Sequence, residues 1–234
     1  MSRFYPLVRV FGALLVGFSL CLAVPMGLSW YVDDGAHGAF DEAFLLTLAT
    51  GLALFFVARR ERRELKVRDG FLLVVLVWTT LPMFACLPLV LHLGISVTDA
   101  YFEAVSGLTA TGATVLSGLD HMPLSINFWR TFMHWIGGMG VVVLAVAILP
   151  LLGIGGRQMF KAETPGPMKE NSLTPRIAET AKGLWRVYLI LTVLCTGAYW
   201  LAGMEAWDAL MHAFSTMGLG GFSTKDASLG HYAS

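Results

Sequence analysis

Long apolar segments separated by short polar links form the dominant pattern of this chain. Several of the segments approach or exceed the roughly 20 residues that cross the hydrocarbon core of a bilayer as an α-helix. We therefore predict membrane-spanning helices at Val8–Trp30, Phe40–Ala58, Phe71–Leu93, Phe128–Leu152 and Leu184–Gly203. The first apolar run is longer than the core of about 7–15 residues of a secretory signal peptide, so we expect it to be retained as a helix.

The composition favours a membrane protein. Of the 234 residues, 56% are hydrophobic and 14% are charged, and the mean hydropathy is +0.67. A soluble domain of this length needs more polar surface to cover its core. The formal net charge of zero implies no bulk attraction to nucleic acid. Cys21, Cys86 and Cys195 lie in separate apolar segments without a CxxC motif, which predicts neither a disulfide framework nor a zinc site.

The distribution of charge predicts the orientation. Basic residues crowd the link Arg59–Arg68 and the stretch Arg157–Arg186, whereas the link Asp33–Asp41 is acidic. Lys and Arg mark the cytoplasmic side of a membrane protein. We therefore expect the N-terminus to be cytoplasmic, and Asp33–Asp41 and Leu116–Asn127 to lie outside.

Part of the sequence occurs twice. The chain reads DAYFEAVSGLTATGATV from Asp99 and DALMHAFSTMGLGGFST from Asp208, 109 positions later. Four further pairs are identical at this offset, namely Ala100 with Ala209, Ala104 with Ala213, Ser106 with Ser215, and Gly112 with Gly221. Both copies follow a long apolar stretch and end in an uncharged run rich in Gly, Thr and Ser. A short helix followed by a glycine-containing loop, placed twice at membrane depth, indicates an ion pore.

The start of each copy is too short to cross the membrane. As a helix, Asp99–Leu108 would cover about 15 Å, half of a hydrocarbon core of about 30 Å. The span before it is expected to end outside and the span after it to begin outside, so we expect the segment to enter the membrane and return. We expect Asp99 and Asp208 to cap the two short helices at the outer surface. The C-terminal ends then point into the membrane, where their partial negative charge stabilises a cation.

The loops that follow are named here the first return loop, Thr109–Thr114, and the second return loop, Gly218–Ser223. Non-helical backbone at this depth leaves carbonyl groups that hydrocarbon cannot solvate, but a water-filled path or a bound cation can. Gly112 and Gly221 permit dihedral angles that point successive carbonyls one way. Neither loop contains an acidic side chain, which disfavours a calcium-type carboxylate ring. The alternative is that Gly and Thr only mediate close helix packing.

Four stretches resemble the bacterial Trk potassium-uptake membrane subunits of the TrkH/TrkG type, in the Trk/Ktr/HKT superfamily. They are SGLTATGATV, FWRTFMHWIGGMGVVVLAVAILP, GRQMFKAETPGPMKENSLTPRIAETAKGLWRVY and HAFSTMGLGGFSTKDASLG, and the resemblance extends from about Leu7 to the end. It implies an all-α membrane protein of four helix–pore loop–helix units, preceded by two extra transmembrane helices. It also implies potassium uptake across the bacterial inner membrane, a homodimer, and a cytosolic nucleotide-binding TrkA-type regulatory subunit.

The resemblance further implies that backbone carbonyls of the return loops coordinate K⁺, the transported ion, without another cofactor. The filter residues that carry over are Ala110, Thr111, Gly112, Leu219, Gly220 and Gly221. The K⁺ ligands among them would be Thr111, Gly112, Leu219 and Gly220.

These expectations divide the chain into four parts. Residues 1–70 would hold two transmembrane helices and a basic link, 71–152 the first unit, 153–183 a cytoplasmic loop, and 184–234 the second unit up to its return loop. Since chains of this family continue into two more units, we interpret the sequence as their N-terminal half. The polar segment Ala162–Pro175 is expected to be either a solvated loop or a contact for the regulatory partner.

The sequence disfavours an enzyme and leaves one other function class open. An intramembrane protease would need a Ser/His pair, paired aspartates or an HExxH motif within the spans, and from the sequence we expect none of these. We therefore expect no enzyme. A structural or assembly subunit without ion conduction stays an alternative. The sequence leaves open channel-like passage against coupled symport, and K⁺ against Na⁺.

Several polar residues and glycines lie in the apolar segments. Glu103, with His212 aligned to it, is an ionisable group inside the membrane and hence either a functional candidate or the partner of a neighbouring group. Arg130 and His134 are expected to reach the outer interface from the fourth span. Three glycines of that span are expected to pack closely against a pore loop: Gly137, Gly138 and Gly140.

Overall fold

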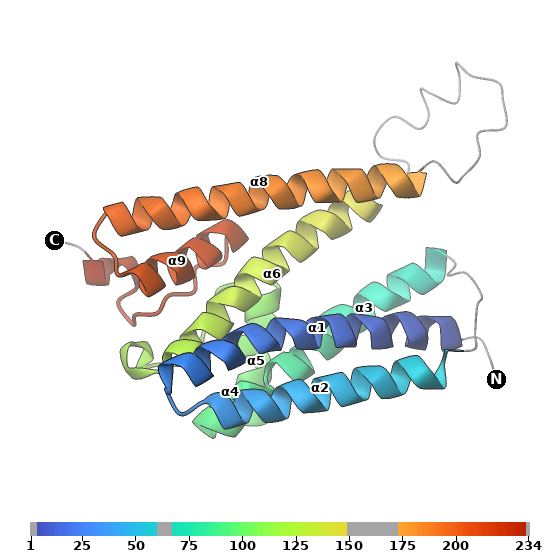
Figure 1. Cartoon of the computed structure of the whole chain (residues 1–234), viewed down its shortest axis with the longest axis horizontal. Helices are drawn as coiled ribbons and strands as arrows, with labels where there is room; N and C mark the ends of the chain where they lie inside the picture. Colours follow the sequence, from blue (N-terminus) through green and yellow to red (C-terminus); the bar gives the residue numbers. More distant parts are fainter. Residues whose placement is uncertain (1–3, 60–66, 149–172, 233–234) are drawn as a thin grey trace, which may run out of the picture.

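The computed structural model describes residues 4–59, 67–148 and 173–232, and within them it contains helices and no strands. This confirms the predicted all-α class (Figure 1). The α-helices are α1 (Tyr5–Val32), α2 (His37–Val57), α3 (Val67–Ala85), α4 (Leu87–Leu93), α5 (Val97–Leu108), α6 (Leu124–Ile148), α8 (Leu173–Leu201) and α9 (Ala206–Gly218). Two short 3-10 helices, η1 (Leu119–His121) and η3 (Ser228–Tyr232), follow the return loops.

Four helical segments of the described residues are long and apolar enough to cross a membrane: Tyr5–Val32, His37–Val57, Arg68–Leu93 and Glu179–Leu201. They match the first, second, third and fifth predicted spans. The fourth predicted span, Phe128–Leu152, corresponds to α6, and its end beyond Ile148 lies outside the described residues. Most of Ala162–Pro175 also lies outside them.

The third span is two helices rather than one. α3 ends at Ala85 and α4 begins at Leu87. Pro82 and Pro88 flank this break, and proline has no N–H to continue the helical hydrogen-bond ladder. The Cys86 N–H still donates to the Pro82 carbonyl at 3.0 Å, so the chain keeps its overall direction.

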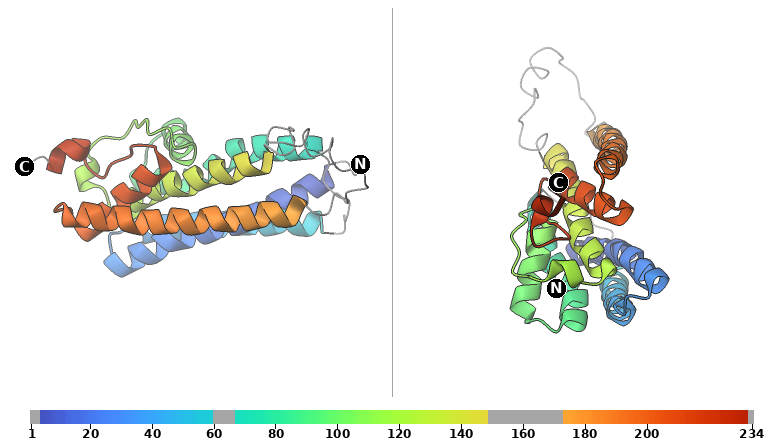
Figure 2. Two further views of the ribbon diagram at one scale, coloured as in Figure 1. Left: turned by 90° about the horizontal axis from the view of Figure 1, so that it is seen from above. Right: turned by 90° about the vertical axis from the view of Figure 1, so that its left-hand side faces the viewer.

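α6 is the central element of the arrangement. It packs against α1, α5, α8 and α9. In Figure 1 it runs obliquely between the α1–α2 pair and α8. An aromatic cluster fills its contact with α9, where Phe128, Phe132 and Trp135 each lie 5.4–5.6 Å from the Phe214 ring centroid. The short helices α5 and α9 lie toward the end of the molecule away from the N-terminus (Figure 2).

α1 and α2 touch through two glycines. A Cβ added to Gly12 would lie 2.6 Å from the Phe55 nitrogen, and one added to Gly51 would lie 2.8 Å from the Val16 nitrogen. These neighbours are backbone atoms, which cannot move without shifting the helix. Small residues thus let the two helices approach closely, as is common between membrane helices.

We expect Gly51→Ala to lower the melting temperature of the purified protein in detergent. The added methyl group forces α1 and α2 apart, and overpacking of this kind costs typically about 1–3 kcal/mol. Gly17→Ala is the matched control, because Gly17 lies on α1 with open space around its Cβ position. The control should be unchanged or slightly more stable, since alanine favours helix by about 1 kcal/mol over glycine. Equal melting temperatures for both variants would refute the close contact.

Candidate ion pathway

The two copies of the repeat fold alike. Each short helix is followed by a backbone hydrogen bond at the same place, from Thr111 N–H to the Ser106 carbonyl at 2.9 Å and from Gly220 N–H to the Ser215 carbonyl at 3.1 Å. The next residues share left-handed backbone, with φ of 54° at Ala110, 77° at Gly112, 59° at Leu219 and 92° at Gly221. The offset of the sequence repeat is thus also the offset of the structural repeat.

The predicted cap of the first short helix is wrong. Ser96, not Asp99, is the N-cap of α5, and its hydroxyl oxygen accepts the Asp99 N–H at 3.1 Å. The Ser96 hydroxyl also donates to Asp99 Oδ2 at 2.8 Å. Asp99 is therefore the third residue of α5, and both its N–H and its carboxylate bond to the hydroxyl of the Ser96 cap.

The predicted cap of the second short helix is also wrong. Glu205 is the N-cap of α9, and no side chain caps the helix. The Asp208 carboxylate instead accepts hydrogen bonds from the Thr224 hydroxyl at 2.8 Å and the Tyr232 hydroxyl at 2.6 Å. Lys225 Nζ lies 3.6 Å from the same carboxylate. Asp208 thus holds the segment that follows the second return loop.

The two return loops meet at their glycines. A Cβ added to Gly112 would lie 1.6 Å from the Gly220 carbonyl oxygen, a distance at which only glycine fits. Around this contact the Leu219 side chain is 90% exposed. The described residues contain no group of three His, Cys, Asp or Glu that could hold a metal ion. The oxygen atoms of the two loops are backbone carbonyls and the hydroxyls of their threonines and of Ser223, and the assignment of the six filter residues stays a prediction.

Arg130 does not reach the outer interface as predicted. Its side chain is fully buried on α6, and its Nη2 lies 2.7 Å from Oε1 of Glu103, which is also fully buried on α5. Because Glu103 compensates its charge, the guanidinium group of Arg130 can be buried away from water. Glu103 also accepts a hydrogen bond from the Thr114 hydroxyl at 2.8 Å, so the pair borders the first return loop.

His134 is buried as well, against the prediction. Its Nδ1 lies 3.1 Å from the Ser215 hydroxyl, and its ring stacks on Phe222 at a centroid distance of 4.0 Å. A Cβ on Gly220 would lie 2.3 Å from His134 Cε1. The hydroxyl oxygen of Ser215 accepts the Gly221 N–H at 3.0 Å. His134 therefore backs the second return loop.

His212 occupies in the second copy the position of Glu103 in the first. Its Nδ1 lies 2.8 Å from the Asp208 carbonyl and its Nε2 lies 3.0 Å from the Ser223 hydroxyl. Ser223 aligns with Thr114, so both copies join a short-helix side chain to a hydroxyl at the end of the return loop. The geometry fits the alternative in which Glu103 and His212 are partners of neighbouring groups.

The three glycines of α6 differ in how closely neighbouring atoms pack against them. A Cβ on Gly137 would lie 2.0 Å from the Leu108 carbonyl oxygen, and one on Gly138 would lie 2.8 Å from Gly218 Cα. These contacts confirm close packing of both glycines at the ends of the short helices. The prediction is wrong for Gly140, which has nothing within 4 Å of its Cβ position.

Hydrogen bonds join several of the connections between helices, which the sequence did not reveal. The Asp226 carboxylate accepts the N–H groups of Gly118 at 2.9 Å and Leu119 at 3.2 Å. The segments that follow the two return loops are thereby joined. In the α1–α2 link, Asp34 accepts the Ser125 N–H at 2.8 Å. Burial acts to raise the pKa of Asp34, but hydrogen bonds, led by that from Ser29, outweigh it and lower the pKa.

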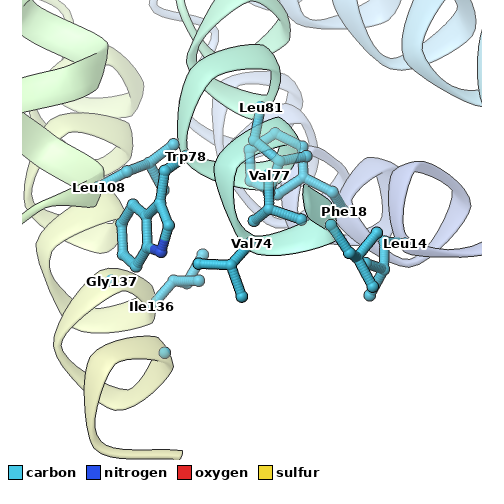
Figure 3. A pocket seen from close by; sticks show the side chains of 11 residues that line it. Leu14, Phe18, Val74, Val77, Trp78, Leu81, Leu108, Ile136 and Gly137 are labelled. Atoms are coloured by element: carbon cyan, nitrogen blue, oxygen red, sulfur yellow. The ribbon is translucent and has the colours of Figure 1, made fainter. Parts of the chain in front are cut away.

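A separate apolar cavity of about 260 Å³ lies between α1, α3, α6 and the end of α5. Figure 3 shows Phe18, Trp78 and Ile136 around it. Its lining is almost wholly hydrocarbon, so it offers no ligands to an ion.

These features define a multi-pass helical membrane protein with two matched units of short helix and return loop. The family model of TrkH, described as a cation transport protein, matches residues 36–234. The chain belongs to this family. The Trk system potassium uptake protein TrkH of Vibrio parahaemolyticus is 52% identical over 234 residues, which cover 99% of this chain and 48% of that protein. The TrkH of Escherichia coli K12 is 50% identical with the same coverage, and its TrkG is 39% identical over 94% of this chain and 46% of TrkG.

A solved structure is also similar to this chain. The crystal structure of the potassium transporter TrkH from Vibrio parahaemolyticus matches with a TM-score of 0.86 and 49% identity. The match covers 99% of this chain and 47% of that one. The chain spans about half the length of the curated relatives it matches.

Proposed function

We propose that this chain supplies two pore segments of a Trk-type potassium uptake protein of the bacterial inner membrane. In this proposal K⁺ passes the return loops and is coordinated by their backbone carbonyls, at Thr111, Gly112, Leu219 and Gly220, with Ala110 and Gly221 shaping the loops. The observation that carries the proposal is the contact of Gly112 with Gly220 between two loops of matching backbone. The names of the relatives, all of them potassium uptake proteins, agree with it.

Carbonyl groups are the ion-binding groups in this proposal. α5 and α9 end at the return loops, and the C-terminal end of a helix carries partial negative charge that stabilises a cation. Carbonyls from several loops can replace the hydration shell of K⁺. The two loops described here supply ligands from two sides, and the family resemblance assigns the other sides to two further units.

The direct test is growth of a potassium-uptake-deficient bacterium on low-potassium medium. The complete gene product that carries this sequence should restore growth and Rb⁺ uptake. Absence of uptake by a correctly inserted protein would contradict the proposal and favour the assembly role.

The proposed orientation places the N-terminus in the cytoplasm and the α5–α6 connection outside. In a variant whose three cysteines are replaced, Ser117→Cys should react with a membrane-impermeant thiol reagent added outside intact cells. Arg68→Cys is the control for the cytoplasmic side and should react only after the membrane is opened. Both side chains are exposed, so accessibility does not differ for other reasons. The reverse labelling pattern would refute the orientation.

We also propose the partners that the family resemblance implies. These are a second copy of the same chain and a cytosolic nucleotide-binding TrkA-type subunit. Crosslinking of the complete protein in membranes, with and without that subunit, tests both contacts.

A further inference from the structure

One guanidinium group touches both return loops. Arg130 Nε and Nη2 donate to Glu103 Oε1 at 2.9 and 2.7 Å. On the side of the first return loop, Arg130 Nη2 donates to the Thr114 hydroxyl oxygen at 3.2 Å. Glu103 Oε2 accepts the N–H of Val115, the residue after the loop, at 3.3 Å. The buried pair thus fixes the end of the first return loop.

The same side chain also reaches the second return loop. Arg130 Nη1 donates to the Ser223 carbonyl at 3.3 Å, and the guanidinium carbon lies 4.6 Å from the centroid of the Phe222 ring. Nη1 further donates to Asn127 Oδ1 at 3.1 Å, which holds the group in place on its own helix. A planar group with five N–H donors in a fixed fork can meet these partners at once, and an ammonium group cannot.

Comparison with the second copy of the repeat shows what Arg130 adds to the first unit. In the second copy the positions of Glu103 and Thr114 hold His212 and Ser223, which bond to each other without an ion pair. A loop of this kind can therefore be held by side chains of its own unit. A buried ion pair adds little net stability, because the cost of removing both charges from water offsets their attraction. What Arg130 adds to the first unit is a connection to the second.

We infer that Arg130 is a positioning residue of the filter, which sets the spacing between the two return loops and thereby the preference for K⁺ over Na⁺. This inference rests on the proposed function. The relevant spacing is that between Gly112 and Gly220, whose contact lies between the two segments that Arg130 joins. A displacement of either loop changes the distance between carbonyls on opposite sides of the ion.

Two variants of the complete gene product, reconstituted in liposomes with K⁺ and Na⁺ gradients, test the inference. Arg130→Lys keeps the charge opposite Glu103 but cannot also hold Ser223. The double variant Glu103→Gln with Arg130→Gln removes both buried charges together, so it leaves no unpaired charge behind. We expect both variants to insert and stay monodisperse. Their K⁺ over Na⁺ permeability ratios should fall about tenfold, equivalent to about 1.4 kcal/mol.

Trp129→Phe is the matched control. Trp129 is the neighbouring buried residue of α6, and its indole N–H donates to the Ala85 carbonyl, away from the loops. It should lose some stability and keep the permeability ratio. Unchanged ratios in both Arg130 variants would overturn the inference, and so would failure of both to fold, because Arg130 would then be needed for the fold itself. A wild-type protein that passes no K⁺ would instead refute the proposed function.

Discussion

Replacement of Gly112 by serine is expected to lower the K⁺ over Na⁺ permeability ratio of the complete protein by about tenfold or more. Two effects combine at this position. A side chain at a φ of 77° costs about 1–2 kcal/mol in backbone strain. Its Cβ would also lie 1.6 Å from the Gly220 carbonyl oxygen, so one loop must move away from the other. The carbonyls that we propose as K⁺ ligands then lose their alignment.

Gly118→Ser separates these two effects. Gly118 has nearly the same backbone, with a φ of 73°, but nothing lies within 4 Å of its Cβ position. It should therefore show the strain without the displacement of the loops, and the permeability ratio should stay close to wild type. Ion flux in liposomes measures both variants. Equal ratios for Gly112→Ser and wild type would count against the filter assignment.

Gly137→Ala is expected to have the largest effect on stability, about 3 kcal/mol, at the upper end of the usual cost of overpacking. Its methyl group would lie 2.0 Å from the Leu108 carbonyl oxygen and 3.0 Å from Leu108 Cα. These are backbone atoms at the end of α5, so the short helix has to leave its place on α6. We expect a lower melting temperature in detergent and loss of potassium uptake together.

Gly140→Ala provides the control for Gly137→Ala on the same helix. Gly140 borders the apolar cavity, so an added methyl group enters free space. Stability and uptake should remain at wild-type values or rise slightly. If both variants behaved alike, the contact between α6 and the end of α5 would not be the cause.

The spans and the repeat could be predicted because their signals are local. The length of an apolar run decides whether it can cross a bilayer, and the predicted spans coincide with α1, α2, the α3–α4 pair and α8. The matched glycines Gly112 and Gly221 indicated two loops of the same kind, and both have positive φ. Such features depend on the chain's own sequence within a few residues.

The partners of the polar side chains could not be predicted in this way. Arg130 pairs with Glu103 on another helix, and Asp226 binds the N–H of Gly118 across more than a hundred positions. One signal was available for the first pair, because two opposite charges inside apolar segments cannot remain unpaired without a large cost. The caps were missed for a different reason. Ser96 lies three positions before Asp99, and its hydroxyl, not the Asp99 carboxylate, accepts the N–H at the start of α5.

The proposed ligands for the transported ion are the carbonyls of the two return loops. The most direct measurement is anomalous diffraction from crystals of the complete protein soaked in Rb⁺ or Tl⁺, both of which can replace K⁺. We expect an anomalous peak between the loops, in direct contact with carbonyl oxygens of Thr111, Gly112, Leu219 and Gly220. Peaks at other places with none at the return loops, in a protein that transports the same ion, would contradict it.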